Sequence, residues 1–100
     1  MSNTAEERAN LLREAASNGR RNPDDLFEAR MMIHGAFEAT GANSNRVCDL
    51  LISDRPPLKE WDCIRLEMVA DLIEADPEAR AEHLFGLCEM VKMIAPWQGD

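Results

Sequence analysis

The sequence predicts an all-α fold, a compact single-domain bundle of about five helices over residues 1–100. Ala, Glu, Leu, Arg and Met abound, tyrosine is absent and β-branched residues are few, a balance that favours helix over sheet. Apolar residues recur at the three- and four-residue spacings of helices. Five glycines and five prolines stand mostly at expected helix ends. One hundred residues without a linker or repeat therefore predict one modest core.

The stretch 56–75 is the expected central helix. Its apolar positions cover more than half of the helical circumference, so we expect neighbouring helices on two of its sides. These positions are Leu58, Trp61, Ile64, Leu66, Met68, Val69, Leu72 and Ile73. Asp62 and Arg65 fall inside the apolar arc, three residues apart, where their side chains can pair with each other.

End signals place the first helix. Thr4 and Glu7 form a capping box that starts it. Gly19 is expected to end it in the left-handed conformation. This assignment leaves Arg20 and Arg21 in the loop that follows.

The later helix boundaries are predicted by the same kinds of signal. Asn22-Pro23 is expected to open a second helix that Gly41 ends. Asn43 or Ser44 caps a short third helix, which is apolar nearly all round and therefore expected to be buried. Asp76-Pro77 is expected to open the last helix.

Charge and cysteine usage restrict the class of protein. Nineteen acidic and 11 basic residues give a formal net charge of −8, which repels nucleic acid and anionic membranes and favours either a basic partner or simple solubility. The longest apolar run is too short for a membrane span, and Met1 begins no signal peptide. Cys48, Cys63 and Cys88 form no close pair, so we expect reduced core thiols in a cytoplasmic protein.

No residue pattern indicates an enzyme, a cofactor or a metal site. His34 and His83 stand far apart and belong to no metal-binding or nucleophile motif, so we interpret them as surface or half-buried histidines. All five glycines are isolated, which excludes a phosphate-binding loop. Carboxylate pairs need a water-poor cleft for acid–base work, and a bundle of this length has little volume for one. We expect a non-enzymatic protein.

A row of carboxylates on the polar side of the central helix is the clearest functional signal. Four of them project within roughly 60° of one another, and the row continues across the next corner: Glu60, Glu67, Asp71, Glu74 and Glu78. Four helical residues span about 6 Å, comparable to the separation of successive phosphates on a nucleic-acid strand. Lys59 is the only cation expected near this strip of the helix, whereas ordinary solvent faces interleave Lys or Arg. The row is either a solvated face or an uncompensated anionic surface for a basic groove.

Two further features are candidate contacts with a partner. Arg20-Arg21 is the only basic doublet, and it predicts either a solvated loop or a contact with phosphate or an acidic partner. Met93 adapts its shape and Trp97 is of the type that anchors interfaces, although Trp97 can equally fold back over the core. The candidate partner-binding residues are Glu60, Glu67, Asp71, Glu74, Glu78, Arg20, Arg21 and Trp97.

In size, acidity, helical content and this acidic row, the whole chain resembles the small phage-encoded anti-CRISPR proteins that block type I surveillance complexes. The resemblance is one of class and involves no diagnostic motif. It implies an inhibitor in the host bacterial cytoplasm that docks on basic Cas subunits and competes with target DNA, or prevents the movement that admits it. The alternative is a homodimeric helical adaptor or regulatory protein of a mobile element, with Met93, Trp97 and the third helix at its interface.

Overall fold

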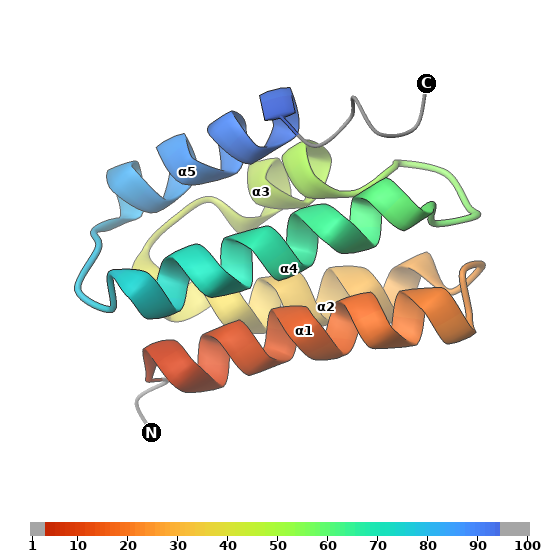
Figure 1. The fold of residues 1–100 in the computed structure, drawn as a ribbon, viewed down its shortest axis with the longest axis horizontal. Coiled ribbons are helices and arrows are strands. Elements are labelled where there is room, and N and C mark those ends of the chain that lie inside the picture. The colour runs from red at the N-terminus through yellow and green to blue at the C-terminus, as the bar shows by residue number, and fades with distance from the viewer. Residues whose placement is uncertain (1–3, 95–100) are drawn as a thin grey trace.

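A computed structural model of the chain describes residues 4–94, which form five α-helices and one short 3-10 helix (Figure 1). In chain order these are α1 (Ala5–Arg21), α2 (Leu26–Phe37), η1 (Glu38–Thr40), α3 (Ser44–Leu51), α4 (Glu60–Ala75) and α5 (Ala81–Ile94). Residues 4–94 contain no strand, and the predicted all-α bundle is confirmed. Within the same residues, no helix has both the length and the apolar character needed to cross a bilayer.

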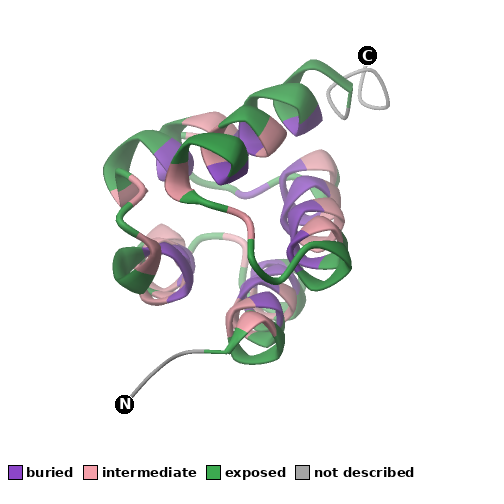
Figure 2. Cartoon of the chain, turned by 90° about the vertical axis from the view of Figure 1, so that its left-hand side faces the viewer, coloured by how far each residue is buried: buried purple, intermediate pink, exposed green. Residues whose placement is uncertain are grey.

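Helix α4 lies in the middle of the bundle, as predicted. It runs antiparallel to α1 along most of its length and also contacts α3 and α5 (Figure 1). Its inward side chains join one hydrophobic core with those of the other helices, and buried residues face the interior on every helix (Figure 2). On α4 the buried apolar residues are Cys63, Leu66, Val69, Ala70 and Ile73. Burial of this kind is the main favourable contribution to folding.

The expected end of α1 at Gly19 is wrong. The helix continues to Arg21, so Arg20 and Arg21 lie in its last turn instead of a loop. Gly19 is buried, and a Cβ at this position would lie 3.0 Å from Leu58 Cδ1 and 3.2 Å from Cys63 Sγ. The missing side chain therefore lets α1 approach the start of α4 closely. Among the described glycines, the one with positive φ is Gly41, at 86°, which ends η1.

Three helices begin later than predicted. Each was expected to open at a proline, but α2 begins at Leu26, α4 at Glu60 and α5 at Ala81. The segment before α2 forms a turn, and the Asp25 carboxylate caps the helix by accepting the Glu28 N–H at 3.1 Å. The predicted caps Thr4 of α1 and Asn43 of α3 are confirmed. Within residues 4–94 the prolines therefore belong to the connections and not to the first helical turns.

The predicted pairing of Asp62 with Arg65 is confirmed, and both residues are buried. Arg65 Nη1 donates to Asp62 Oδ1 at 3.1 Å and to the Leu51 carbonyl at 3.3 Å. Asp62 Oδ2 accepts hydrogen bonds from Ser53 Oγ and from the Lys59 backbone N–H, each at 2.9 Å. The pair therefore joins the end of α3, the connection after it and the first turn of α4.

Candidate partner-binding surface

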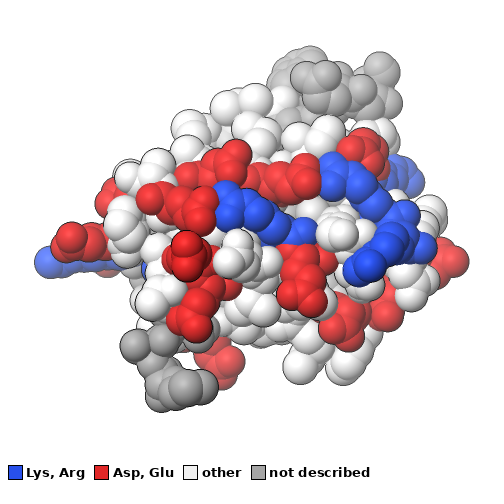
Figure 3. Space-filling model, turned by 60° about the horizontal axis from the view of Figure 1, so that its bottom comes forward, with Lys and Arg blue, Asp and Glu red and all other residues white. Residues whose placement is uncertain are grey.

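The four predicted carboxylates of α4 lie along one side of the helix, next to α1. The side chains of Glu60 and Asp71 are 62% and 75% exposed, and those of Glu67 and Glu74 are partly covered. Acidic side chains gather on this face of the molecule, with basic side chains between them (Figure 3). We call Glu60, Glu67, Asp71 and Glu74 the acidic row.

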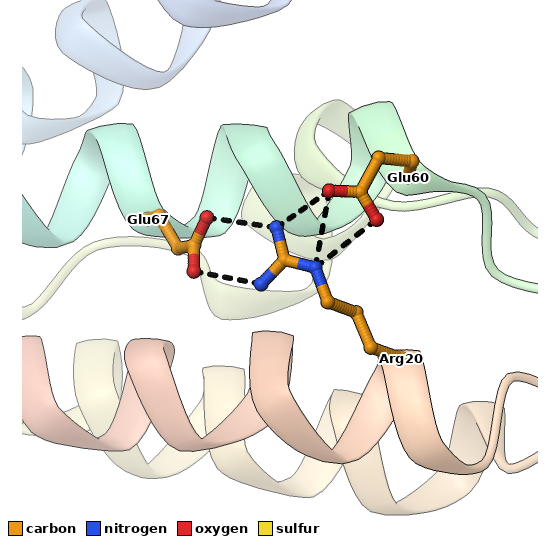
Figure 4. Close-up of polar contacts among 3 residues, drawn as sticks. All are labelled: Arg20, Glu60 and Glu67. Carbon is orange, nitrogen blue, oxygen red and sulfur yellow. Dashed lines mark hydrogen bonds and ion pairs between the residues drawn. The ribbon is translucent and has the colours of Figure 1, made fainter.

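The acidic row is not uncompensated, which corrects the expectation drawn from the sequence. The guanidinium of Arg20, from α1, lies between Glu60 and Glu67 (Figure 4). Nε and Nη2 donate to the Glu60 carboxylate at 3.0 and 2.8 Å, while Nη1 and Nη2 donate to Glu67 at 2.7 and 2.9 Å. A planar guanidinium can hold two carboxylates in this way, because it offers two bidentate edges. All three nitrogens of Arg20 are therefore engaged within the chain.

Arg13 repeats the arrangement two turns earlier on α1. Its Nη2 donates to Asp71 Oδ1 at 2.8 Å and also to Glu74 Oε1. The two arginines are seven residues apart, as are Glu60, Glu67 and Glu74. Because α1 and α4 are antiparallel, this shared two-turn period brings each arginine between two carboxylates. The matched seven-residue spacing of the arginines and glutamates is the sequence signal for these bridges, and it lies in two segments far apart along the chain.

These contacts favour the ionised form of the three glutamates of the row. Hydrogen bonds from Arg20 lower the pKa of both Glu60 and Glu67, and a hydrogen bond from Arg13 lowers the pKa of Glu74. The same bonds raise the pKa of the two arginines. These three glutamates are therefore ionised at neutral pH. Four carboxylates facing two guanidiniums leave a formal excess of two negative charges on this surface.

The remaining candidate residues lie elsewhere. Glu78 is exposed in the turn between α4 and α5 and makes no ion pair within residues 4–94. Arg21 is exposed at the end of α1. Met93 is 74% exposed on α5, away from the core as expected. Trp97 lies outside the described residues.

The histidines and cysteines form no reactive centre in the described part of the chain. His34 Nδ1 hydrogen-bonds with Ser44 Oγ, and His83 Nε2 lies 3.7 Å from Asp76 Oδ2. No group of three or more potential metal ligands occurs within residues 4–94. The three cysteines are free and buried. Burial raises the pKa of the Cys48 thiol to about 11 and that of Cys88 to about 12, which disfavours the reactive thiolate.

A scan against protein-family models and searches of curated proteins and of solved structures found no match to this chain. The charges and contacts of this surface are therefore the basis of the function proposed below.

Proposed function

We propose that this chain is a non-enzymatic protein inhibitor that binds a basic protein surface through the acidic row. We further propose that its target is a type I CRISPR surveillance complex in the bacterial cytoplasm, whose binding to target DNA it blocks. The observation that carries the proposal is the excess of ionised carboxylates over guanidiniums along one exposed side of α4. This charge suits a groove that is built to hold phosphates.

The two arginines support the proposal in one respect. They hold the carboxylates in fixed positions, and so less side-chain entropy is lost when a partner binds them. A carboxylate offers about four lone-pair sites, and one arginine on each leaves sites for lysines or arginines of the partner. Glu78 and Glu82, both exposed, add negative charge beyond the end of α4.

The arginines also limit the proposal, because they remove half of the formal charge of the row. A nucleic-acid strand carries one uncompensated charge per phosphate, whereas the acidic row carries one per two carboxylates. The free energy of binding to a basic groove must therefore come from complementary shape and from the carboxylates outside the bridges, as well as from net charge. The competing interpretation, a face that only keeps the chain soluble, predicts no specific partner.

Target-DNA binding by purified surveillance complexes tests the proposal. We expect the chain to inhibit target binding by a type I-E or a type I-F complex, and we expect inhibition to weaken as ionic strength rises, since exposed charges are screened. Electrophoretic mobility shift of the target DNA at several salt concentrations measures the inhibition and its dependence on ionic strength. Unaltered DNA binding with both complexes would remove the proposed target.

Charge-neutralising variants locate the surface. Asp71→Asn with Glu78→Gln removes one exposed carboxylate of the acidic row and one in the turn beyond it, and should weaken inhibition several-fold. Glu38→Gln with Glu89→Gln removes the same charge from η1 and α5 and should leave inhibition unchanged. Reversal of the row to lysine is unsuitable, because it would place cations opposite Arg13 and Arg20. Circular dichroism should report the same helix content for both double variants.

A homodimeric helical adaptor is the second candidate, and one observation favours it. Met90, Met93 and Ile94 of α5 are exposed, and large apolar side chains are enriched at protein interfaces. The third helix is a poor interface, since Val47, Cys48 and Leu51 are buried in the core. Light scattering separates the candidates: a stable dimer that Met93→Lys converts to a monomer would favour the adaptor.

A further inference from the structure

A pocket of about 530 Å³ lies between the end of α3, the connection after it, the first turns of α4 and the last turns of α5. Pockets of this size bind small ligands or single side chains of a partner. Leu50, Ile52 and Trp61 contribute apolar surface to its lining. Exposed charged residues and the buried Asp62–Arg65 pair complete it. It shares no residue with the acidic row.

Arg65 is the unusual member of this lining, because it is only 8% exposed and incompletely hydrogen-bonded. Its Nη1 is satisfied by Asp62 and Leu51, but its Nε is buried without a partner. Nearly all buried N–H groups in proteins have an acceptor, and a guanidinium contributes donors only. Nε itself is covered, so an acceptor from outside the chain has to use Nη2 of Arg65, which donates to no residue of the described chain.

The charges around the pocket decide which acceptor fits. Asp62 is already occupied by Arg65, Ser53 and Lys59. The other charged lining residues are Asp49, Asp54 and Lys92, all exposed, with one more carboxylate than ammonium, and Arg30 Nη2 approaches Asp49 Oδ1 to 4.0 Å from outside the lining. An anionic ligand would meet this excess and the net charge of −8, whereas a neutral carbonyl would not. The two aspartates instead favour a cation close to the carbonyl.

Trp61 restricts the type of cation that fits the pocket. A guanidinium or a long aliphatic stem packs well on an indole face, and Lys59 Nζ already lies 5.8 Å from the Trp61 ring centroid. An arginine residue within a peptide combines all the required groups. It has a planar cation for the carboxylates, an aliphatic stem for the tryptophan and a backbone carbonyl as acceptor.

We propose that this pocket binds an arginine of a partner protein. Its guanidinium lies at Asp49 and Asp54, its stem lies on Trp61, and its backbone carbonyl accepts a hydrogen bond from Arg65. The inference rests on the proposed function in one respect, since it names a second contact with the same basic partner. It is otherwise independent, because no residue of the acidic row takes part.

Short blocked peptides test the pocket directly. The probes are acetyl-Gly-Arg-Gly-amide, its citrulline counterpart, which has the same shape without the charge, and acetyl-Gly-Glu-Gly-amide. A Trp97→Phe background leaves Trp61 as the one tryptophan, so its fluorescence reports on the pocket. We expect the arginine peptide to bind saturably and about fivefold more tightly than the citrulline peptide, as one or two exposed ion pairs allow. The glutamate peptide should not bind.

Matched variants show where the peptide binds. Asp49→Asn and Asp54→Asn should each weaken binding of the arginine peptide about threefold and leave the citrulline peptide unaffected. Asp24→Asn, an exposed position in the turn before α2, should change neither. The inference is overturned by equal binding of the arginine and citrulline peptides, by tighter binding of the glutamate peptide, by equal effects of all three variants, or by no saturable binding.

The outcomes for the pocket and for the proposed function are distinguishable. Inhibition of a surveillance complex without peptide binding would overturn the pocket inference and leave the proposed function intact. Saturable arginine-peptide binding without inhibition would support the pocket and remove the proposed target. If both hold, Asp54→Asn should weaken inhibition about as much as it weakens peptide binding.

Discussion

Asp62 is the one buried carboxylate in the described part of the chain. It is fully buried, and a buried carboxylate is tolerable only when cations and hydrogen-bond donors compensate it. Arg65, Ser53 and the Lys59 backbone supply that compensation. Because Ser53 and Lys59 stand at the two ends of the connection between α3 and α4 and Arg65 lies in α4, the carboxylate also fixes how this connection lies against α4.

Removal of Asp62 should therefore destabilise the fold strongly. Asp62→Ala leaves the buried Arg65 charge unpaired, and we expect the free energy of unfolding to fall by about 3–5 kcal/mol. The double variant Asp62→Ala with Arg65→Met should recover part of this loss, because it removes the unpaired cation as well. Urea unfolding at pH 7 measures both. Simple additivity of the single-variant effects would contradict the paired role.

Arg20 differs from the neighbouring Arg21 despite their adjacency in the sequence. Its guanidinium is held by Glu60 and Glu67, whereas Arg21 is exposed at the helix end. The doublet is therefore not a unit for binding phosphate. Of the two residues that the sequence proposed as a basic contact, one stabilises the association of α1 with α4.

At the scale of the helices, two glycines in comparable positions should respond differently to substitution. Gly86 lies in α5 with open space around it, whereas Gly19 lies in α1 against Leu58 and Cys63. Gly86→Ala should raise the free energy of unfolding by about 0.5–1 kcal/mol, the difference in helix propensity. Gly19→Ala raises helix propensity by the same amount, but its methyl group would crowd Leu58 and Cys63 where α1 packs against α4. We therefore expect this substitution to be destabilising.

Thermal or urea unfolding of the two alanine variants tests this prediction, with each serving as the control for the other. Equal stabilisation by both substitutions would show that α1 and α4 separate by a few tenths of an ångström without loss. The close approach would then not depend on the missing side chain of Gly19.

The sequence predicts the helices well and their ends poorly. The inward face of α4 follows from a local period of 3.6 residues, which can be read without knowing the neighbouring helices. Gly19 was misassigned because a glycine in a helical pattern has two meanings, a stop or a close contact, and only the position of Leu58 and Cys63 separates them. Pro56 and Pro77 were misassigned for a similar reason, since proline suits both a first helical turn and a connection.

The candidate surface shows the limit of reasoning from one helix. The acidic row on α4 is visible in the sequence because its members share a helical face. Its partners Arg13 and Arg20 lie about 50 residues away in sequence, and they become neighbours only when α1 packs antiparallel to α4. The pocket at Trp61 was missed for the same reason, as its residues come from three helices and a connection.

At the scale of the molecule, the bridges between α1 and α4 connect folding to pH. The described residues extend over 33 × 26 × 20 Å, so many of the 19 acidic side chains of the chain are close enough to repel one another. Protonation relieves that repulsion as the pH approaches the sequence pI of about 4.7. It also removes the carboxylates that Arg13 and Arg20 require. The two effects oppose each other, and a matched variant separates them.

The pKa directions give the sign of the bridge contribution. The pKa values of Glu60, Glu67 and Glu74 are lower in the folded chain than the ordinary value of 4.5. The bridges therefore stabilise the fold fully above about pH 4.5 and lose this contribution as the pH falls through the folded-state pKa values. Arg13→Gln with Arg20→Gln removes the bridges and leaves the carboxylates, so its stability should fall less steeply below pH 4.5 than that of the unchanged chain.

Urea unfolding from pH 7 to pH 3 measures this difference. At pH 7 the double variant should be less stable by about 1 kcal/mol for each arginine, the upper range for exposed ion pairs, and the two curves should converge at the acidic end. Sodium chloride at high concentration should reduce the difference in free energy of unfolding between the two proteins at pH 7. Both bridges are partly exposed, and exposed charges are screened. Coincident curves at all pH values would show that the bridges orient the carboxylates without stabilising the fold.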